Sequence, residues 1–187
     1  PDGVSGDWTT PVKEQGNCGS CWAFAATGVV ESIYDIVEHD PYLDTNLSEE
    51  YLVSGAIYDE NCCGGWADDA LFYYKNSGVA DESSLAYVSG GDCTCYGSGI
   101  CGSGCAYSAQ GRCSDADYGP AHDSQDVKKY TIAAFAQVAA DAPSIEQAIY
   151  DHGPVTATIR YENEHDGFDS DRVYRCDLDL ETDPNHA

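Results

Sequence analysis

Basic residues are scarce in this chain of 187 residues, which has 8 lysines and arginines against 33 aspartates and glutamates and a formal net charge of −25. Nucleic acid is a poor partner for such a chain, because binding to phosphates requires a basic surface. No apolar run approaches the length that spans a membrane. No signal peptide is visible and the first residue is Pro1, so either a leader has been removed or the chain is an excerpt of a longer protein. We expect no nucleic-acid partner and no membrane span in this chain.

The acidic residues are spread along the whole chain rather than gathered in one run. Such a surface keeps a protein soluble by self-repulsion. Our hypothesis is a high-salt habitat, because salt shortens the range of that repulsion to about 3 Å at roughly 1 M.

Ten cysteines are many for a chain of this length. In a reducing cytosol they would indicate metal binding or redox work, and outside the cell they indicate disulfides. Together with the acidic composition they favour disulfides and an extracellular or cell-surface protein. The hydrophobic content of 42% is sufficient for a folded core.

The apolar pattern predicts helices in the first half and strands in the second. A helix is expected over 21–38, ended by Pro41, with one apolar face at spacings of three and four: Trp22, Ala25, Val29, Ile33 and Ile36. Further helices are expected after the capping residue Ser48, over 67–75 and over 143–149. Strands are expected over 129–138 and, after the Gly153-Pro154 turn, through the alternation of Val155, Ala157, Ile159 and Tyr161.

Residues 89–125 differ from the rest of the chain, because they are rich in glycine, contain five cysteines and show no apolar periodicity. A segment of this kind cannot build a core by itself and has to be cross-linked. We interpret it as a cross-linked surface insertion.

Cys21 lies where the first helix is expected to begin, six residues after Gln15. A helix N-terminus and a nearby imidazolium both favour a thiolate, which can attack a carbonyl carbon while the histidine later protonates the leaving amine. The oxyanion that forms needs fixed donors, and the backbone N–H of Cys21 and the amide of Gln15 are available. On cysteine content alone, a redox disulfide between Cys18 and Cys21 is an equal alternative.

The motif Cys18-Gly19-Ser20-Cys21-Trp22 matches a signature of papain-family cysteine proteases. Six further segments resemble that family in the same order: 7–16, 47–53, Cys62-Cys63-Gly64-Gly65-Trp66, Gly153-Pro154-Val155, 168–174 and Asn185-His186-Ala187. The resemblance covers most of the chain except 89–125. It implies an α+β papain-like fold of two lobes with a cleft between them.

Under this resemblance, one peptidase domain covers 1–187 and is partial at its C-terminus. Residues 1–125 form a mostly helical lobe that includes the insertion 89–125, and 126–187 form an incomplete antiparallel β-barrel lobe.

The resemblance also assigns roles to individual residues. Cys21 is the nucleophile, His186 the general base and acid, and Gln15 the oxyanion donor. The implied substrate-binding residues are Gly64, Gly65, Trp66, Ala67, Thr158 and Asn185. The other histidines, His39, His122, His152 and His165, are expected to be surface or structural residues.

The resemblance implies a disulfide between Cys18 and Cys62, which leaves Cys21 free. Six cysteines then remain for the insertion, with fifteen possible pairings: Cys63, Cys93, Cys95, Cys101, Cys105 and Cys113. Zinc on four of these sulfurs is a rival hypothesis, although the usual paired spacing is missing.

Three departures from the family pattern stand out. Gly55 replaces the cysteine that usually ends the second helical segment, and Cys62 and Cys63 are adjacent where the family has one cysteine. The orienting asparagine and a shielding tryptophan usually follow the histidine, but the sequence ends at Ala187. We therefore expect the chain to be a fragment with weak or no activity of its own, and Cys176 to pair outside it.

The function that the resemblance implies is a cysteine endopeptidase acting on polypeptides through a thioester acyl-enzyme. We expect no cofactor and no metal, and membership of a larger multidomain protein is compatible with the chain. One rival is a non-catalytic binding or adhesion module on a protease scaffold. Another is a thiol–disulfide exchanger, which requires Cys18 to be free.

Overall fold

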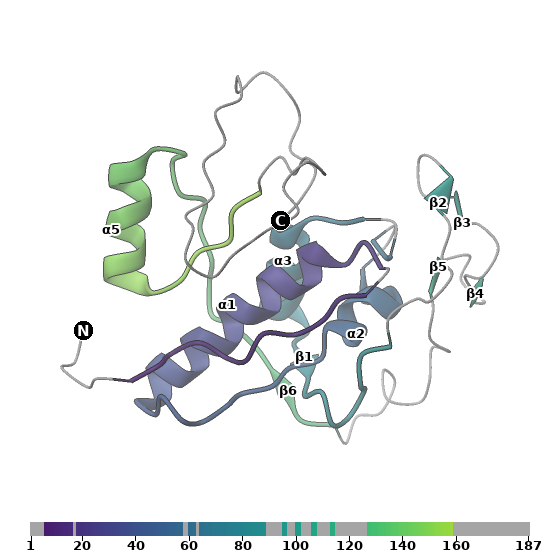
Figure 1. Ribbon diagram of the computed structural model, residues 1–187, viewed down its shortest axis with the longest axis horizontal. Coiled ribbons are helices and arrows are strands. Elements are labelled where there is room, and N and C mark those ends of the chain that lie inside the picture. The colour runs from purple at the N-terminus through teal and green to yellow at the C-terminus, as the bar shows by residue number, and fades with distance from the viewer. Residues whose placement is uncertain are drawn as a thin grey trace.

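The computed structural model describes residues 6–16, 18–57, 60–62, 64–88 and 127–158, together with the backbone of four short strands between 95 and 114. The described helices are α1 (Cys21–Glu38), α2 (Glu49–Tyr51), a π-helical turn η1 (Leu52–Ala56), α3 (Ala67–Asn76) and α5 (Ala142–His152). Figure 1 shows α1 lying across α3, with α2 beside them and α5 standing apart near the other end of α1.

The core of the described region lies between α1, α3 and the segment that carries α2 and η1. Trp22, Tyr51 and Tyr74 are its largest fully buried side chains. Tyr74 on α3 hydrogen-bonds through its hydroxyl to Thr27 on α1, with 3.0 Å between the oxygens. The remaining apolar core residues are smaller and come from these elements and from neighbouring segments: Cys18, Ala23, Ala26, Val30, Leu47, Leu52, Val53, Cys62, Ala67, Ala70, Val79 and Ala80.

The first helix begins and ends where the sequence predicts, but its buried face is different. Of the predicted apolar face only Trp22 is buried, and Ala25, Val29, Ile33 and Ile36 are half-buried. The buried face instead contains Ala23, Ala26, Thr27, Val30, Glu31, Ser32 and Asp35. The prediction was wrong because it counted only apolar residues, whereas this face buries charged groups together with their partners.

The other side of α1 is packed as well. A Cβ atom placed on Gly153, whose φ is +99°, would lie 3.0 Å from Cδ1 of Ile33 and 3.1 Å from Cδ1 of Ile36. The chain leaving α5 therefore passes close to the second apolar side of α1, and this position requires glycine.

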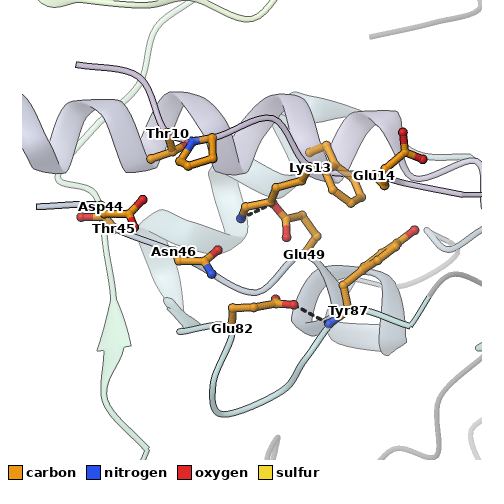
Figure 2. Close-up of a pocket in the computed structure, with 11 residues that line it drawn as sticks. Thr10, Lys13, Glu14, Asp44, Thr45, Asn46, Glu49, Glu82 and Tyr87 are labelled. Carbon is orange, nitrogen blue, oxygen red and sulfur yellow. Dashed lines mark hydrogen bonds and ion pairs between the residues drawn. The ribbon is translucent and has the colours of Figure 1, made fainter. Parts of the chain in front are cut away.

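The buried acids of α1 are held by specific partners. Lys13 Nζ lies 2.8 Å from Oε1 of both Glu31 and Glu49, and Figure 2 shows its pairing with Glu49. Asp35 accepts a hydrogen bond of 2.7 Å from the Thr45 hydroxyl. Burial of a charge is tolerable when it is paired and hydrogen-bonded in this way.

Two of the other predicted helices are confirmed with their caps. The Ser48 hydroxyl accepts a hydrogen bond of 3.0 Å from the Tyr51 N–H at the start of α2. The Asp141 carboxylate does the same for the Ser144 N–H, also at 3.0 Å, at the start of α5. α5 is longer than the predicted 143–149 and contains no buried residue.

The described strands are short and pair antiparallel. β1 (Val79–Ala80) pairs with β6 (Lys129–Tyr130), and this pair joins two distant parts of the chain. The other two pairs lie within 89–125: β2 (Cys95–Tyr96) with β3 (Ile100–Cys101), and β4 (Ala106–Tyr107) with β5 (Cys113–Ser114). The predicted strand over 129–138 is limited to its first two residues.

The second predicted strand is also corrected. Residues 153–158 form no strand, so the alternation at Val155 and Ala157 was misleading, and Ile159 and Tyr161 lie outside the described residues. Strand formation depends on a partner strand as well as on alternation, and the described residues offer none here. None of the helices among the described residues is long and apolar enough to cross a membrane.

Candidate active site

Cys21 is the first residue of the 18-residue helix α1. Its thiol is free and its side chain is partly exposed. The first N–H groups of an α-helix have no acceptor within the helix. The backbone N–H of Cys21 therefore points out of the helix start, on the same residue as the thiol.

Cys18 is joined to Cys62 by a disulfide that bridges 44 residues of sequence. This confirms the pairing that the resemblance implies. Beside it, the Gly19 N–H donates a hydrogen bond of 2.7 Å to the Cys62 carbonyl. Because Cys18 is occupied, the redox alternative of a disulfide between Cys18 and Cys21 is not what the structure contains.

The Gly64-Gly65 segment is held against the residue that follows Cys21. Asn61 and Gly64 exchange two backbone hydrogen bonds of 3.1 Å, and Gly64 has a φ of +134°. A Cβ on Gly65 would lie 2.5 Å from Cε2 of Trp22, so no larger residue fits there without displacing the indole. The Trp22 indole N–H also donates to the Asn61 carbonyl at 3.3 Å. The nucleophile candidate and the glycine segment are thus fixed to one another through Trp22 and the disulfide.

Trp66 and Ala67 follow at the start of α3. Trp66 precedes the helix with an extended backbone, and its side chain is 55% exposed, whereas Ala67 is buried. The Trp66 N–H lies 3.0 Å and 3.1 Å from the two carboxyl oxygens of Glu60, which is itself buried. The structure therefore adds Glu60, which the sequence did not single out, as the residue that holds this segment.

Burial raises the pKa of Glu60 to about 8, and a hydrogen bond with Asp69 and the charges of Asp69 and Asp68 act in the same direction. The hydrogen bond from the Trp66 N–H opposes the shift, because it favours the ionised form. The protonated form of Glu60 therefore persists to higher pH than that of an ordinary glutamate.

Gln15 is held by contacts that the sequence did not reveal. Its side-chain amide donates to the Cys18 carbonyl at 2.8 Å. The Tyr87 hydroxyl donates to the Gln15 carbonyl at 2.8 Å and lies 2.7 Å from the Ser20 hydroxyl. A tyrosine has one hydroxyl proton, so Ser20 must be the donor in the second bond. Tyr87 thus connects the Gln15 segment to the residue before Cys21, and no local sequence signal links residues so far apart.

The remaining predicted site residues lie in the C-terminal part of the chain. Thr158 is exposed in the irregular segment after α5, and Asn185 and His186 lie outside the described residues. Of the other histidines, His39 and His152 are exposed, while His122 and His165 lie outside the description.

The side chains of the six cysteines assigned to the insertion lie outside the described part of the structure. This applies to Cys63, Cys93, Cys95, Cys101, Cys105 and Cys113, and Cys176 also lies outside. Within the described residues, no group of three or more histidine, cysteine or acidic side chains could hold a metal ion.

A family model described as papain family cysteine protease matches residues 4–187 of the sequence. The chain belongs to the papain family of cysteine proteases. Among relatives of this papain-family chain, Zingipain-2 of Zingiber officinale is 33% identical over 172 residues, which cover 88% of the chain and 72% of that protein.

Other relatives match shorter stretches. Digestive cysteine proteinase 1 of Homarus americanus is 38% identical over 56% of the chain and 34% of its own length. Cysteine proteinase A of Leishmania mexicana is 44% identical over 49% of the chain and 27% of its own length. The matched part of the papain-family chain thus spans about a third or less of these two proteins.

The fold is also similar to a solved structure from work on antibody cross-reactivity between the mite allergens Blo t 1 and Der p 1. The TM-score is 0.54 at 23% identity, over 81% of this chain and 46% of that one. The papain-like fold is therefore supported by sequence and by structure.

Proposed function

We propose that this papain-family chain carries the nucleophile of a cysteine endopeptidase that hydrolyses polypeptides through a thioester acyl-enzyme. The observation that carries the proposal is the free, partly exposed thiol of Cys21 at the first residue of α1. Its neighbour Cys18 is removed from thiol chemistry by the disulfide to Cys62.

The proposed reaction begins with attack of the Cys21 thiolate on the carbonyl carbon of the substrate. The tetrahedral oxyanion accepts hydrogen bonds from the Cys21 N–H and from the Gln15 amide. The intermediate collapses to a thioester as His186 protonates the leaving amine, and water activated by His186 then releases the acid. The hydrogen bond between the Gln15 amide and the Cys18 carbonyl supports a place for Gln15 next to the helix start.

The proposed substrate is an extended polypeptide that lies along Gly64 and Gly65 and pairs with the backbone of Gly65, because the Gly64 backbone is already bonded to Asn61. Residues without side chains allow close approach of another chain, and the contact with Trp22 keeps the segment next to Cys21. Trp66, Ala67 and Thr158 are proposed to border the pocket for the residue two before the cut, with Asn185 next to the general base.

The proposed setting of the enzyme is extracellular or at a cell surface, within a protein that contains more than this chain. The disulfide supports an oxidising compartment.

We also propose that residues 1–125 and 126–187 form two lobes with the cleft between them, the second lobe being an incomplete antiparallel barrel. A separate proposal is that the protein is adapted to high salt. Unfolding midpoints measured in dilute and molar salt test the last point, since unchanged stability in molar salt would exclude it.

The function is tested by alkylation of the full-length protein that contains this chain. Iodoacetamide should label Cys21 first and abolish peptide hydrolysis in step with labelling, and Cys21→Ala should lose activity by orders of magnitude. Gln15→Ala should lose about 10²–10³-fold in kcat, the usual cost of one oxyanion donor. A Cys21→Ala variant with full activity would exclude the proposal. The control is Ser83→Ala, which removes an exposed hydroxyl that has no role in the proposed site.

A further inference from the structure

A polar pocket lies beside the first turn of α1, with a cavity volume of about 340 Å³. Its walls come from the segment 10–14, from α1, from the loop before α2, from α2 itself and from the segment after β1. Figure 2 shows Lys13, Glu49 and Glu82 around it, with Asp44, Thr45 and Asn46 on one side and Tyr87 on the other. No role in the proposed peptidase reaction involves this pocket.

The ammonium group of Lys13, which lines the pocket, already uses all its N–H donors. Lys13 Nζ donates to Glu31 Oε1 at 2.8 Å, to the Leu47 carbonyl at 3.1 Å and to Glu49 Oε1 at 2.8 Å. An ammonium group has three N–H donors. Lys13 is therefore saturated by these three acceptors.

Two carboxylate oxygens in the same wall remain without a partner. Glu49 is 1% exposed, and while its Oε1 receives Lys13, its Oε2 has no hydrogen-bond partner. Glu82 accepts the Tyr87 N–H at 2.7 Å through Oε1, and its Oε2 is likewise buried and unpartnered. Buried acceptors without donors are costly, so each of these oxygens requires an explanation.

The charge balance of the pocket points in the same direction. The single charge of Lys13 faces Glu31, Glu49 and Glu82, which carry three negative charges when ionised. Burial raises the pKa of Glu49 to about 7, against the opposing effect of Lys13. Burial also raises the pKa of Glu82. In both groups burial outweighs the attraction of Lys13, which lowers the pKa.

A cationic N–H donor fits this wall better than a metal ion. No group of three or more metal-ligating side chains occurs in the described region. Pro11, Phe24 and Tyr87 contribute apolar wall, and the last two rings pack edge to face at 4.8 Å between centroids. Aromatic faces and carboxylates together suit an alkyl chain that ends in an ammonium group.

We propose that this pocket binds a small aliphatic amine, whose primary ammonium group donates hydrogen bonds to Glu49 and Glu82. The proposal does not depend on peptidase activity, because none of these contacts involves Cys21 or Gln15.

The test is calorimetric titration of the chain with 1,4-diaminobutane at constant ionic strength, with 1,4-butanediol as the uncharged probe of the same length. Diaminobutane should bind and butanediol should not. Glu82→Gln should weaken the binding of diaminobutane at least ten-fold, because it removes one charge and puts an N–H donor where an acceptor is needed. Its carbonyl oxygen still accepts the Tyr87 N–H, so the local fold is retained.

The matched control is Glu146→Gln, which makes the same charge change on the exposed face of α5 and should leave the affinity unchanged. Equal weakening in both variants would mean general attraction to an acidic protein and would overturn the proposal, as would equal binding of the diol. If Glu82→Gln fails to melt cooperatively, Glu49→Gln replaces it, because its carbonyl oxygen still accepts Lys13 while its NH2 group takes the place of the unpartnered oxygen. Unchanged affinity in that variant relative to Glu146→Gln would also overturn the proposal.

Discussion

The acidic residues of α1 and α2 and those of α5 have opposite environments. Glu31, Asp35 and Glu49 are buried and each has a named partner. Glu146 and Asp151 on α5 are exposed, and α5 buries no residue at all. The acidic residues that make up the net charge therefore fall into two groups: buried ones that are hydrogen-bonded or paired in the core, and exposed ones that contact water. Their contributions to stability should differ accordingly.

The largest expected effect is at the centre of the buried network. Lys13→Met removes the cation from Glu31 and Glu49 and should cost about 3–5 kcal/mol in the free energy of unfolding, the typical cost of leaving buried charges unpaired. Urea unfolding measures it. Lys128→Met, at an exposed lysine that hydrogen-bonds to the Tyr130 hydroxyl and lies over the Tyr130 ring, should change it by less than about 0.5 kcal/mol. Equal effects would erase the distinction between the two environments.

The next effect concerns the cross-link. Replacing Cys18 and Cys62 together by alanine should lower the free energy of unfolding by about 2–4 kcal/mol, because the unfolded chain regains the freedom of a long loop. Cys21→Ala, which removes a partly exposed free thiol, should leave it nearly unchanged. A thermal melt of each variant is sufficient, and a double variant as stable as the native chain would contradict the structural role of the disulfide.

A smaller effect should appear in the pH dependence of stability through Glu60. Its pKa is about 8 in the folded chain against an ordinary 4.5, so the folded state binds more protons than the unfolded state between these values. The free energy of unfolding should therefore fall as pH rises through this window, by at most about 1.4 kcal/mol per pH unit. Glu60→Gln should remove this contribution, because the neutral amide still accepts the Trp66 N–H. Stability curves of native and variant that run parallel from pH 5 to pH 9 would contradict the prediction, and Glu146→Gln serves as the control for a lost surface charge.

The smallest effect is expected on α5. Ile149, 48% exposed, should tolerate alanine with a change below about 0.5 kcal/mol in the free energy of unfolding. Val30→Ala at a buried position of α1 removes two methyl groups and should cost about 1–3 kcal/mol. Chemical denaturation measures the free energy of unfolding of both variants. If Ile149→Ala lowers it as much as Val30→Ala does, the contrast between α5 and α1 is wrong.

Local signals in the sequence predicted those features that depend on neighbouring residues. The start of α1 at Cys21, the Ser48 cap and the third helix are confirmed within one or two residues. The strand over 129–138 is confirmed only at its first two residues, and the strand begun at Val155 is not found, because strands need a partner that alternation does not identify. The buried face of α1 was also missed, since an apolar pattern cannot reveal that Glu31 and Asp35 have partners in Lys13, Thr10 and Thr45.

The sequence by itself therefore determined the family of this chain, the first residue of its main helix and the cysteine that stands there, because each follows from short-range pattern or motif. The tertiary structure decided which acids are buried, which residues hold Gln15 and the Gly64-Gly65 segment, and where two carboxylate oxygens lack a donor. These features arise from contacts between residues tens of positions apart, such as Ser20 with Tyr87 and Lys13 with Glu49. Only the folded chain brings such groups within hydrogen-bonding distance.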